Sequence, residues 1–456
     1  MKKPEKGLSA GRLTMMALGS VIGGSFFLGS SVGIHAAGPA VLLSFVLGGV
    51  LAYFILYALS EMTVANPDSG SFRTFAAQSL GQGSGFVVGW VYWTGMVLAM
   101  SSEATAVSIL LREWFPDFPL FLMGSLIIIG VTLMNLLGAD RLSKLESGLA
   151  AVKLLALISF IVIGVLLIIG LLPSHRLIGM GELKHEAFFP SGMKGVAGSM
   201  LIVMLAYSGF EIIGLAASET ENPKKTVPRA INSTILSLVG LYIVTAAVLL
   251  PLVPTAEVNE NASPMVAALN RYGMSWAGTA LNVVLITAIL STMLASMFGQ
   301  GRMMRSLADE GLAPIWLKDK TDVPYRGILS TGAAMLLGLS FGQLFPKIYL
   351  FLVSAGGFSI LFTYAMIMAT HIRFRKCNGC PPDGKCQMWG FPYTSLIVLV
   401  SIILIMISMP FVPGQESGLI AGISIVLFFT LCYFAVRHFR RKRTKENKSS
   451  LNTDPN

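Results

Sequence analysis

Three ionisable residues lie inside otherwise apolar stretches and are the first candidates for chemistry: Glu103, Lys153 and Glu211. A charge held in hydrocarbon is costly, so such a residue usually faces a partner, a water-filled path or a ligand. Each of the three is therefore a candidate functional residue. Two alternatives stay open: the Lys153 side chain could extend to the membrane surface, and Glu103 could be a buried, protonated hydrogen-bonding residue. Glu61 lies near the end of its stretch, which favours an interfacial or capping carboxylate.

Two stretches rich in glycine and serine interrupt the apolar segments. The first reads GSVIGGSFFLGSS over residues 19–31, and the second reads YSGFEIIG over residues 207–214. Glycine weakens a helix because it loses more backbone freedom on folding than other residues do. Such stretches are either close packing surfaces between helices or points where a helix breaks. Two breaks at corresponding positions of two halves are typical of an inverted-repeat transporter whose substrate site lies at the breaks.

Three cysteines, Cys377, Cys380 and Cys386, lie close together in the stretch CNGCPPDGKC. They are compatible with reduced thiols of a structural loop, with a zinc site that takes His371 as a fourth ligand, or with a redox-sensitive disulfide. The second C-x-x-C that would make a zinc site specific is absent from the sequence. Neither H-E-x-x-H nor a phosphate-binding G-x-x-x-x-G-K-S/T occurs. The sequence therefore gives no support to a metalloprotease, an ATP-driven pump or a bound cofactor.

The elements that must position these groups are membrane-spanning helices. Hydrophobic residues make up 54% of the 456 and charged residues only 12%, whereas soluble domains are about a quarter charged. Apolar runs of about 20 residues, long enough to cross a bilayer as helices, recur along the chain. We therefore expect an all-α polytopic membrane protein with about twelve spans, at residues 12–37, 39–65, 84–111, 119–137, 146–172, 196–219, 229–253, 273–299, 327–346, 348–372, 392–411 and 416–436.

The basic residues indicate how these spans are oriented. Twelve spans place both termini on one side of the membrane, and 26 of the 33 Lys and Arg residues fall on that side against 6 on the other. Because basic loops stay in the cytoplasm, we predict cytoplasmic termini in a cell membrane. The net charge of +10 then reflects topology and not a nucleic-acid partner. The basic tail at residues 437–456 is expected to be disordered and to contact anionic lipid headgroups of the bilayer.

Six collinear stretches resemble motifs of the amino acid–polyamine–organocation superfamily, and specifically of its bacterial amino acid permeases. The stretch IGGSFFLGS at residues 22–30 looks like the first-span signature I-G-T-G-L-F-L-G-S, although Gly24-Ser25 stands where the family commonly has T-G. The second element, YSGFEIIGLAASETENPKKTVPRAI at residues 207–231, is similar to the sixth-span signature. The other four stretches are LSEMTVANPDSGSFRTFA, GWVYWTG with SSEATA, RMMRSLADEGLAP and HIRFR, at residues 59–76, 89–106, 302–314 and 371–375.

The resemblance implies a fold of two five-helix inverted repeats, at residues 12–172 and 196–372, with broken first and sixth helices. The remaining segments would be a cytoplasmic N-terminus (1–11), a cysteine-containing cytoplasmic loop (373–391), two peripheral spans (392–436) and the tail. By resemblance, the N–H groups of Gly23, Gly24 and Ser25 should bind the carboxylate of an amino acid substrate. The carbonyl groups of Val21, Ile22, Tyr207 and Ser208 should bind its ammonium group, and Phe210 should line the pocket.

The resemblance also suggests how transport is driven. Proton-coupled members of the superfamily resemble this chain in having a lysine in the fifth span, the place of Lys153, where sodium-coupled relatives bind an ion. We therefore expect proton symport of a neutral, aliphatic amino acid, with Glu103 and Glu211 as further protonation or gating groups. An amino acid exchanger is the alternative within transport, and a non-transporting sensor is the alternative outside it. The sequence offers no catalytic constellation that would make the protein an enzyme.

Overall fold

The computed structural model describes residues 8–66, 70–172, 177–215, 220, 222–319, 321, 323–345, 347–380 and 386–451, without the side chains of 139–147, 215 and 439–451. Helices account for nearly all regular structure in these ranges, apart from one isolated parallel bridge between Leu8 and Thr220. The α-helices are α1 (Ala10–Val21), α2 (Gly24–Phe27), α3 (Gly29–Ala37), α4 (Val41–Ala65), α5 (Ser71–Leu80), α6 (Gln82–Leu111), α7 (Leu120–Asn135), α8 (Ala139–Ile168), α9 (Gly192–Ala206), α10 (Ile212–Leu215), α11 (Pro223–Leu249), α12 (Pro264–Arg271), α13 (Ser275–Asp309), α14 (Tyr325–Gly342), α15 (Ile348–Asn378), α16 (Tyr393–Ser408) and α17 (Glu416–Leu451).

Most of these helices are apolar enough to lie in a membrane, as the sequence predicts. Within the described residues, 8 helical segments are long and apolar enough to cross one, and the shorter helices α7 and α9 are apolar as well. The predicted spans all fall on helices: the first on α1 to α3, the sixth on α9 and α10, and the ninth on α14. Residues 216–219, at the end of the predicted sixth span, lie outside the described residues. The all-α polytopic fold is thus confirmed.

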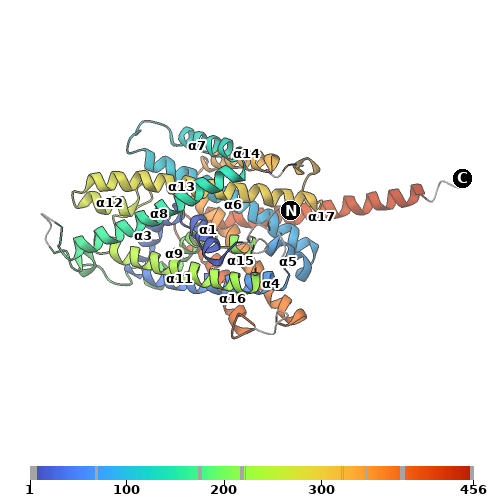
Figure 1. The fold of residues 1–456 in the computed structure, drawn as a ribbon, viewed down its shortest axis with the longest axis horizontal. Helices are drawn as coiled ribbons and strands as arrows, with labels where there is room; N and C mark the ends of the chain where they lie inside the picture. The colour runs from blue at the N-terminus through green and yellow to red at the C-terminus, as the bar shows by residue number, and fades with distance from the viewer. Residues whose placement is uncertain are drawn as a thin grey trace, which may run out of the picture.

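The helices form one bundle (Figure 1). Among the eight long apolar segments, those of α6 and α15 are the most buried. Small residues let these two helices approach closely. A Cβ on Gly95 of α6 would lie 2.6 Å from the Cβ of Ser359, and one on Gly356 of α15 would lie 3.0 Å from the N atom of Ala99. Such small-residue contacts are a usual way for helices to pack in lipid, where burial of apolar surface supplies little driving force.

The C-terminal helix differs from the sequence-based expectation. The helix α17 continues to Leu451 and projects beyond the bundle, as the red helix in Figure 1 shows. The prediction of a disordered tail is therefore wrong for residues 437–451, and residues 452–456 lie outside the described residues. The physical reason is continuity: a helix already formed by the apolar segment extends at low cost through residues such as Arg, Lys and Glu, which are good helix formers.

Candidate functional site

The first span breaks at the predicted glycines. Helix α1 ends at Val21, Ile22 and Gly23 adopt extended backbone angles, and α2 begins at Gly24. A break of this kind leaves backbone N–H and C=O groups without the partners they would have in a continuous helix. Ile22 and Gly24 are buried, so those groups face the interior of the protein.

The sixth span breaks as well, and the two breaks are in contact. Helix α9 ends at Ala206, residues 207–211 form turns, and α10 begins at Ile212. Gly209 has a φ of +101°, a conformation that favours glycine. The hydroxyl of Ser20 lies 3.0 Å from the carbonyl oxygen of Gly209, and a Cβ on Gly209 would lie 2.9 Å from the carbonyl oxygen of Ser20. The close approach of the breaks thus depends on Gly209.

Glu103 of α6 lies at the beginning of α2. One of its carboxylate oxygens accepts a hydrogen bond of 2.7 Å from the N–H of Gly24. The other accepts bonds of 3.1 Å from both the N–H and the hydroxyl of Ser25. The N–H groups of Gly24 and Ser25, predicted to bind a substrate carboxylate, are therefore bound by a carboxylate of the protein itself. These bonds fit the interpretation of Glu103 as a buried hydrogen-bonding residue.

Lys153 of α8 lies on the other side of the first break. Its side chain is completely buried, and its ammonium group donates hydrogen bonds to the carbonyl oxygens of Gly19, at 2.6 Å, and Ile22, at 3.2 Å. It also lies 3.2 Å from the hydroxyl of Thr292 in α13, which itself lies 3.1 Å from the oxygen of Ile22. Lys153 thus does not extend to the membrane surface, and it joins the fifth and eighth spans to the break in the first.

Glu211 closes the turn of the second break. Its carboxylate accepts hydrogen bonds from the hydroxyl of Tyr92 in α6, at 2.9 Å, and from the hydroxyl of Tyr364 in α15, at 3.1 Å. It also accepts the N–H of Gly209 at 3.0 Å. The ring of Phe210 stacks on that of Tyr364, with centroids 5.1 Å apart. The unwound segment is therefore held to both central helices.

The remaining predicted residues lie at the same two breaks. Val21 ends α1, and the Tyr207 hydroxyl donates a hydrogen bond of 3.0 Å to the carbonyl oxygen of Phe45. The Ser208 hydroxyl donates one of 2.6 Å to the carbonyl oxygen of Leu205. Three residues that bind the charged groups at the breaks were not anticipated from the sequence: Thr292, Tyr92 and Tyr364. Their signal is weak, since a hydroxyl in an apolar helix is common and its partner lies far away along the chain.

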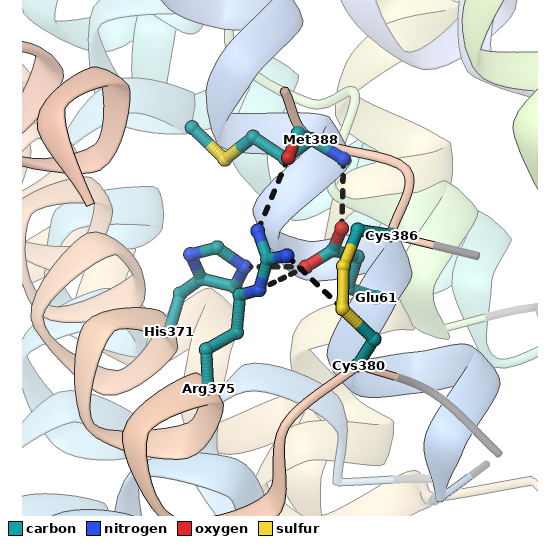
Figure 2. The surroundings of a disulfide bond; sticks show 6 residues. All are labelled: Glu61, His371, Arg375, Cys380, Cys386 and Met388. Carbon is teal, nitrogen blue, oxygen red and sulfur yellow. Dashed lines mark hydrogen bonds and ion pairs between the residues drawn. A yellow bond between two sulfur atoms is a disulfide. The ribbon is translucent and has the colours of Figure 1, made fainter. Parts of the chain in front are cut away.

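The cysteine loop has a different organisation from a metal site. Cys380 and Cys386 form a disulfide (Figure 2). Cys377 is an exposed free thiol. His371, the suggested fourth ligand, instead contacts Glu61 at 2.7 Å. Among the residues that the structure describes, no group of three or more His, Cys, Asp or Glu side chains is arranged to hold a metal. Of the three states left open by the sequence, the structure has the disulfide.

Glu61 is buried, and it fastens this loop to α4. Its carboxylate accepts the N–H of Met388 at 2.7 Å and lies 3.6 Å from the guanidinium of Arg375 (Figure 2). Arg375 donates further hydrogen bonds to the Met388 carbonyl, at 3.1 Å, and to the Cys380 sulfur, at 3.2 Å. The partners of Glu61 come from α15 and from the segment after it, more than 300 residues away, so its burial could not be predicted from the sequence.

The two helix breaks, in contact with each other and each beside a buried charged residue, lie inside a polytopic helical membrane protein. A family model described as "Amino acid permease" matches residues 12–449. The γ-aminobutyric acid permease of Bacillus subtilis is 30% identical over 98% of this chain and 96% of its own length. The γ-aminobutyric acid permease of Escherichia coli is 32% identical over 91% and 90%, and a probable threonine/serine transporter of B. subtilis is 30% identical over 98% of each. The chain belongs to the amino acid permease family, whose named members are transporters and not enzymes.

Proposed function

We propose that this protein is a secondary active permease that couples the uptake of a neutral amino acid to proton entry across the cell membrane. The observation that carries the proposal is the contact between the two breaks, with Lys153 buried on the carbonyl oxygens of Gly19 and Ile22. Its family is one of amino acid permeases.

The two breaks suit the two charged ends of an amino acid. Backbone N–H groups at the start of a helix attract anions, and those of Gly23, Gly24 and Ser25 would bind the substrate carboxylate. Carbonyl oxygens of an unwound segment attract cations, and those of Val21, Tyr207 and Ser208 would bind the ammonium group. The Ile22 oxygen is less suited to this role than the sequence predicts, because Lys153 and Thr292 already contact it.

The pocket wall favours a neutral side chain. Met96 and Met100 of α6, the helix that carries Glu103, and Phe210 of the second break are buried and apolar. The relatives named above are called transporters of γ-aminobutyric acid, threonine or serine. None of these carries an ionised side chain in addition to its amino and carboxyl groups. This supports, for the present chain, a substrate without a charged side chain, with aliphatic amino acids as the first choice.

Lys153 supports proton coupling. A buried ammonium group can lose its proton when it is desolvated, which makes lysine suited to a coupling site. Its two carbonyl partners belong to the break itself, so a change in its protonation would act directly on the first span. Glu103 and Glu211 would then be further gating groups. The excess of Lys and Arg on one side supports cytoplasmic termini.

Competition for uptake tests the substrate class. Purified protein in liposomes would be given labelled leucine and a tenfold excess of each unlabelled amino acid in turn. We expect leucine, threonine and γ-aminobutyrate to compete better than arginine or lysine. Stronger competition by arginine or lysine would contradict the neutral class. Loading the liposomes with unlabelled substrate separates symport from exchange, since an exchanger requires internal substrate for uptake and a symporter does not.

A further inference from the structure

Glu103 occupies the backbone groups that the proposed substrate needs. Its two carboxylate oxygens bind the N–H groups of Gly24 and Ser25 and the Ser25 hydroxyl at 2.7–3.1 Å. A substrate carboxylate has the same two oxygens and would seek the same two N–H groups. A substrate carboxylate and Glu103 would therefore compete for these N–H groups.

We propose that Glu103 is an internal stand-in for the substrate carboxylate and that the substrate must displace it in order to bind. The inference rests on the proposed function and adds to it the residue that decides which ligands are accepted. A ligand with a carboxylate can replace Glu103 on both N–H groups. A ligand that has the amine but no carboxylate leaves Glu103 in place and gains nothing there.

The approach of Glu103 depends on glycine. A Cβ on Gly24 would lie 2.7 Å from the nearer carboxylate oxygen of Glu103 and 3.2 Å from its carboxyl carbon. The next residue, Ser25, carries a hydroxyl that reaches the same carboxylate. The arrangement therefore gives Glu103 both the room at Gly24 and the third hydrogen bond, from the Ser25 hydroxyl.

Glu103 and Ser25 keep a small exposed fraction, as Ser20 and Thr292 at the breaks also do. The exposed fractions are 7% for Glu103 and 9% for Ser25, against 0% for Ile22 and Lys153. The side chains of Glu103 and Ser25 are thus enclosed slightly less completely than those of Ile22 and Lys153.

A buried hydroxyl without a partner lies near the first break, and we infer that it donates a hydrogen bond to Glu103 once the substrate has displaced it. The hydroxyl of Tyr349, at the start of α15, is buried and has no hydrogen-bond partner among the described residues. It lies 3.3 Å from the position that a Cβ on Gly29 would take, one turn beyond Gly24, and in electrostatic range of Glu103. An unpaired buried hydroxyl is costly, so a state in which it donates to Glu103 would repay part of the cost of displacement.

The test is a binding measurement on the purified full-length protein in detergent. The probe is whichever of labelled leucine, threonine and γ-aminobutyrate the wild type binds most tightly, together with the corresponding amino alcohol, which lacks the carboxylate. The variants are Glu103→Gln, Tyr349→Phe and their combination. The control is Tyr57→Phe, which removes a hydroxyl bonded to Asn232 away from the breaks. Thermal unfolding verifies that each variant is folded.

The amide of Glu103→Gln keeps one acceptor oxygen but sets an N–H donor against the other backbone N–H group, so it binds the pair Gly24 and Ser25 less well than the carboxylate does. We expect its Kd for the amino acid to fall by about tenfold or more, as hydrogen bonds to charged groups imply, and its Kd for the amino alcohol to change less than threefold. Tyr349→Phe should raise the Kd for the amino acid at least threefold in the wild-type background and have no effect beside Glu103→Gln.

Two results would overturn the inference: weaker or unchanged amino acid binding by folded Glu103→Gln, or an equal effect of Tyr349→Phe in both backgrounds. Should Glu103→Gln not fold, an equal effect of Tyr349→Phe alone on the amino acid and the amino alcohol would overturn it. If the wild type takes up amino acids but the variants give either of these results, the inference fails and the proposed function stands. A wild type that binds none of the three amino acids contradicts the proposed function, and this inference with it.

Discussion

The hydroxyl of Ser20 lies 3.0 Å from the carbonyl oxygen of Gly209, and this contact joins the broken first span to the broken sixth span. The residues are 189 positions apart in the chain. Lys153 binds a carbonyl oxygen of the first break, and Glu211 binds the N–H of Gly209 in the second. Direct contacts therefore link the two breaks to each other and to the charged group at each.

Gly209→Ala should disturb this junction. The Cβ would meet the Ser20 carbonyl at 2.9 Å, and the residue would keep a φ that costs about 1–3 kcal/mol for a side chain other than glycine. We expect a lower unfolding temperature and at least tenfold slower uptake in liposomes. Gly240→Ala in α11 is the matched control because a Cβ there meets nothing within 4 Å. Equal behaviour of the two variants would contradict the role given to Gly209.

Lys153→Ala should uncouple transport from the proton gradient. The substitution removes the ammonium group and leaves the oxygens of Gly19 and Ile22 without it. We expect accumulation driven by a pH gradient to fall at least tenfold while exchange between equal internal and external substrate continues. Lys194→Ala, at an exposed position of α9, should behave as the wild type. Full accumulation by Lys153→Ala together with dependence on sodium would show that the ion assignment is wrong.

Thiol counting tests the cysteine loop. Of the 4 cysteines, Cys377 and Cys432 are free and the other two are joined. We expect two reactive thiols in protein denatured without reductant and four after reduction, with no bound zinc. Cys380→Ser should give three thiols under both conditions. Four reactive thiols before reduction, together with the release of one zinc per chain on denaturation, would support the metal site instead of the disulfide.

The ion pair between Glu260 and Lys347 should make stability depend on acid pH. The two groups lie 2.9 Å apart. Burial opposes ionisation of the carboxyl, but the hydrogen bond and the charge of Lys347 outweigh it and lower the pKa of Glu260. A lowered pKa stabilises the folded state above the ordinary value of about 4.3, and this stabilisation is lost as the pH falls through the lowered value.

We therefore expect Lys347→Met to be less stable than the wild type at pH 7, by at most about 1 kcal/mol because the pair is partly exposed, and equally stable once Glu260 is protonated. Thermal unfolding in detergent from pH 7 downward measures this. Lys194→Met, which changes the net charge equally, is the control. A difference between Lys347→Met and the wild type that stays constant with pH would mean that the pair does not stabilise the protein.

The fold and the positions of both breaks could be predicted from the sequence because they depend on local composition. Apolar runs determine the spans, and Gly23 and Gly209 mark where the helices stop. The partners of the charged residues could not be predicted. Thr292 beside Lys153 and Tyr364 beside Glu211 lie 139 and 153 residues away, and only the packing of the helices brings them together.

Glu103 illustrates the same division. Its burial in an apolar span could be predicted, and so could the free N–H groups at Gly24 and Ser25. The hydrogen bonds between Glu103 and these N–H groups could not be predicted, because the residues lie about 80 positions apart. Each feature also had its own explanation, gating for Glu103 and substrate binding for the N–H groups. For the tail after residue 436, the high charge predicted disorder. The structure instead continues the apolar helix α17 through residue 451.

We propose that this permease uses a proton gradient to accumulate a neutral amino acid. The uptake of labelled leucine, threonine and γ-aminobutyrate by sodium-free liposomes that contain the purified protein and no internal substrate tests this directly. With an imposed pH gradient, acidic outside, we expect at least one of the three to accumulate above its external concentration and to leave again when a protonophore collapses the gradient. Uptake that ignores the gradient, or that requires sodium or internal amino acid, would contradict the claim.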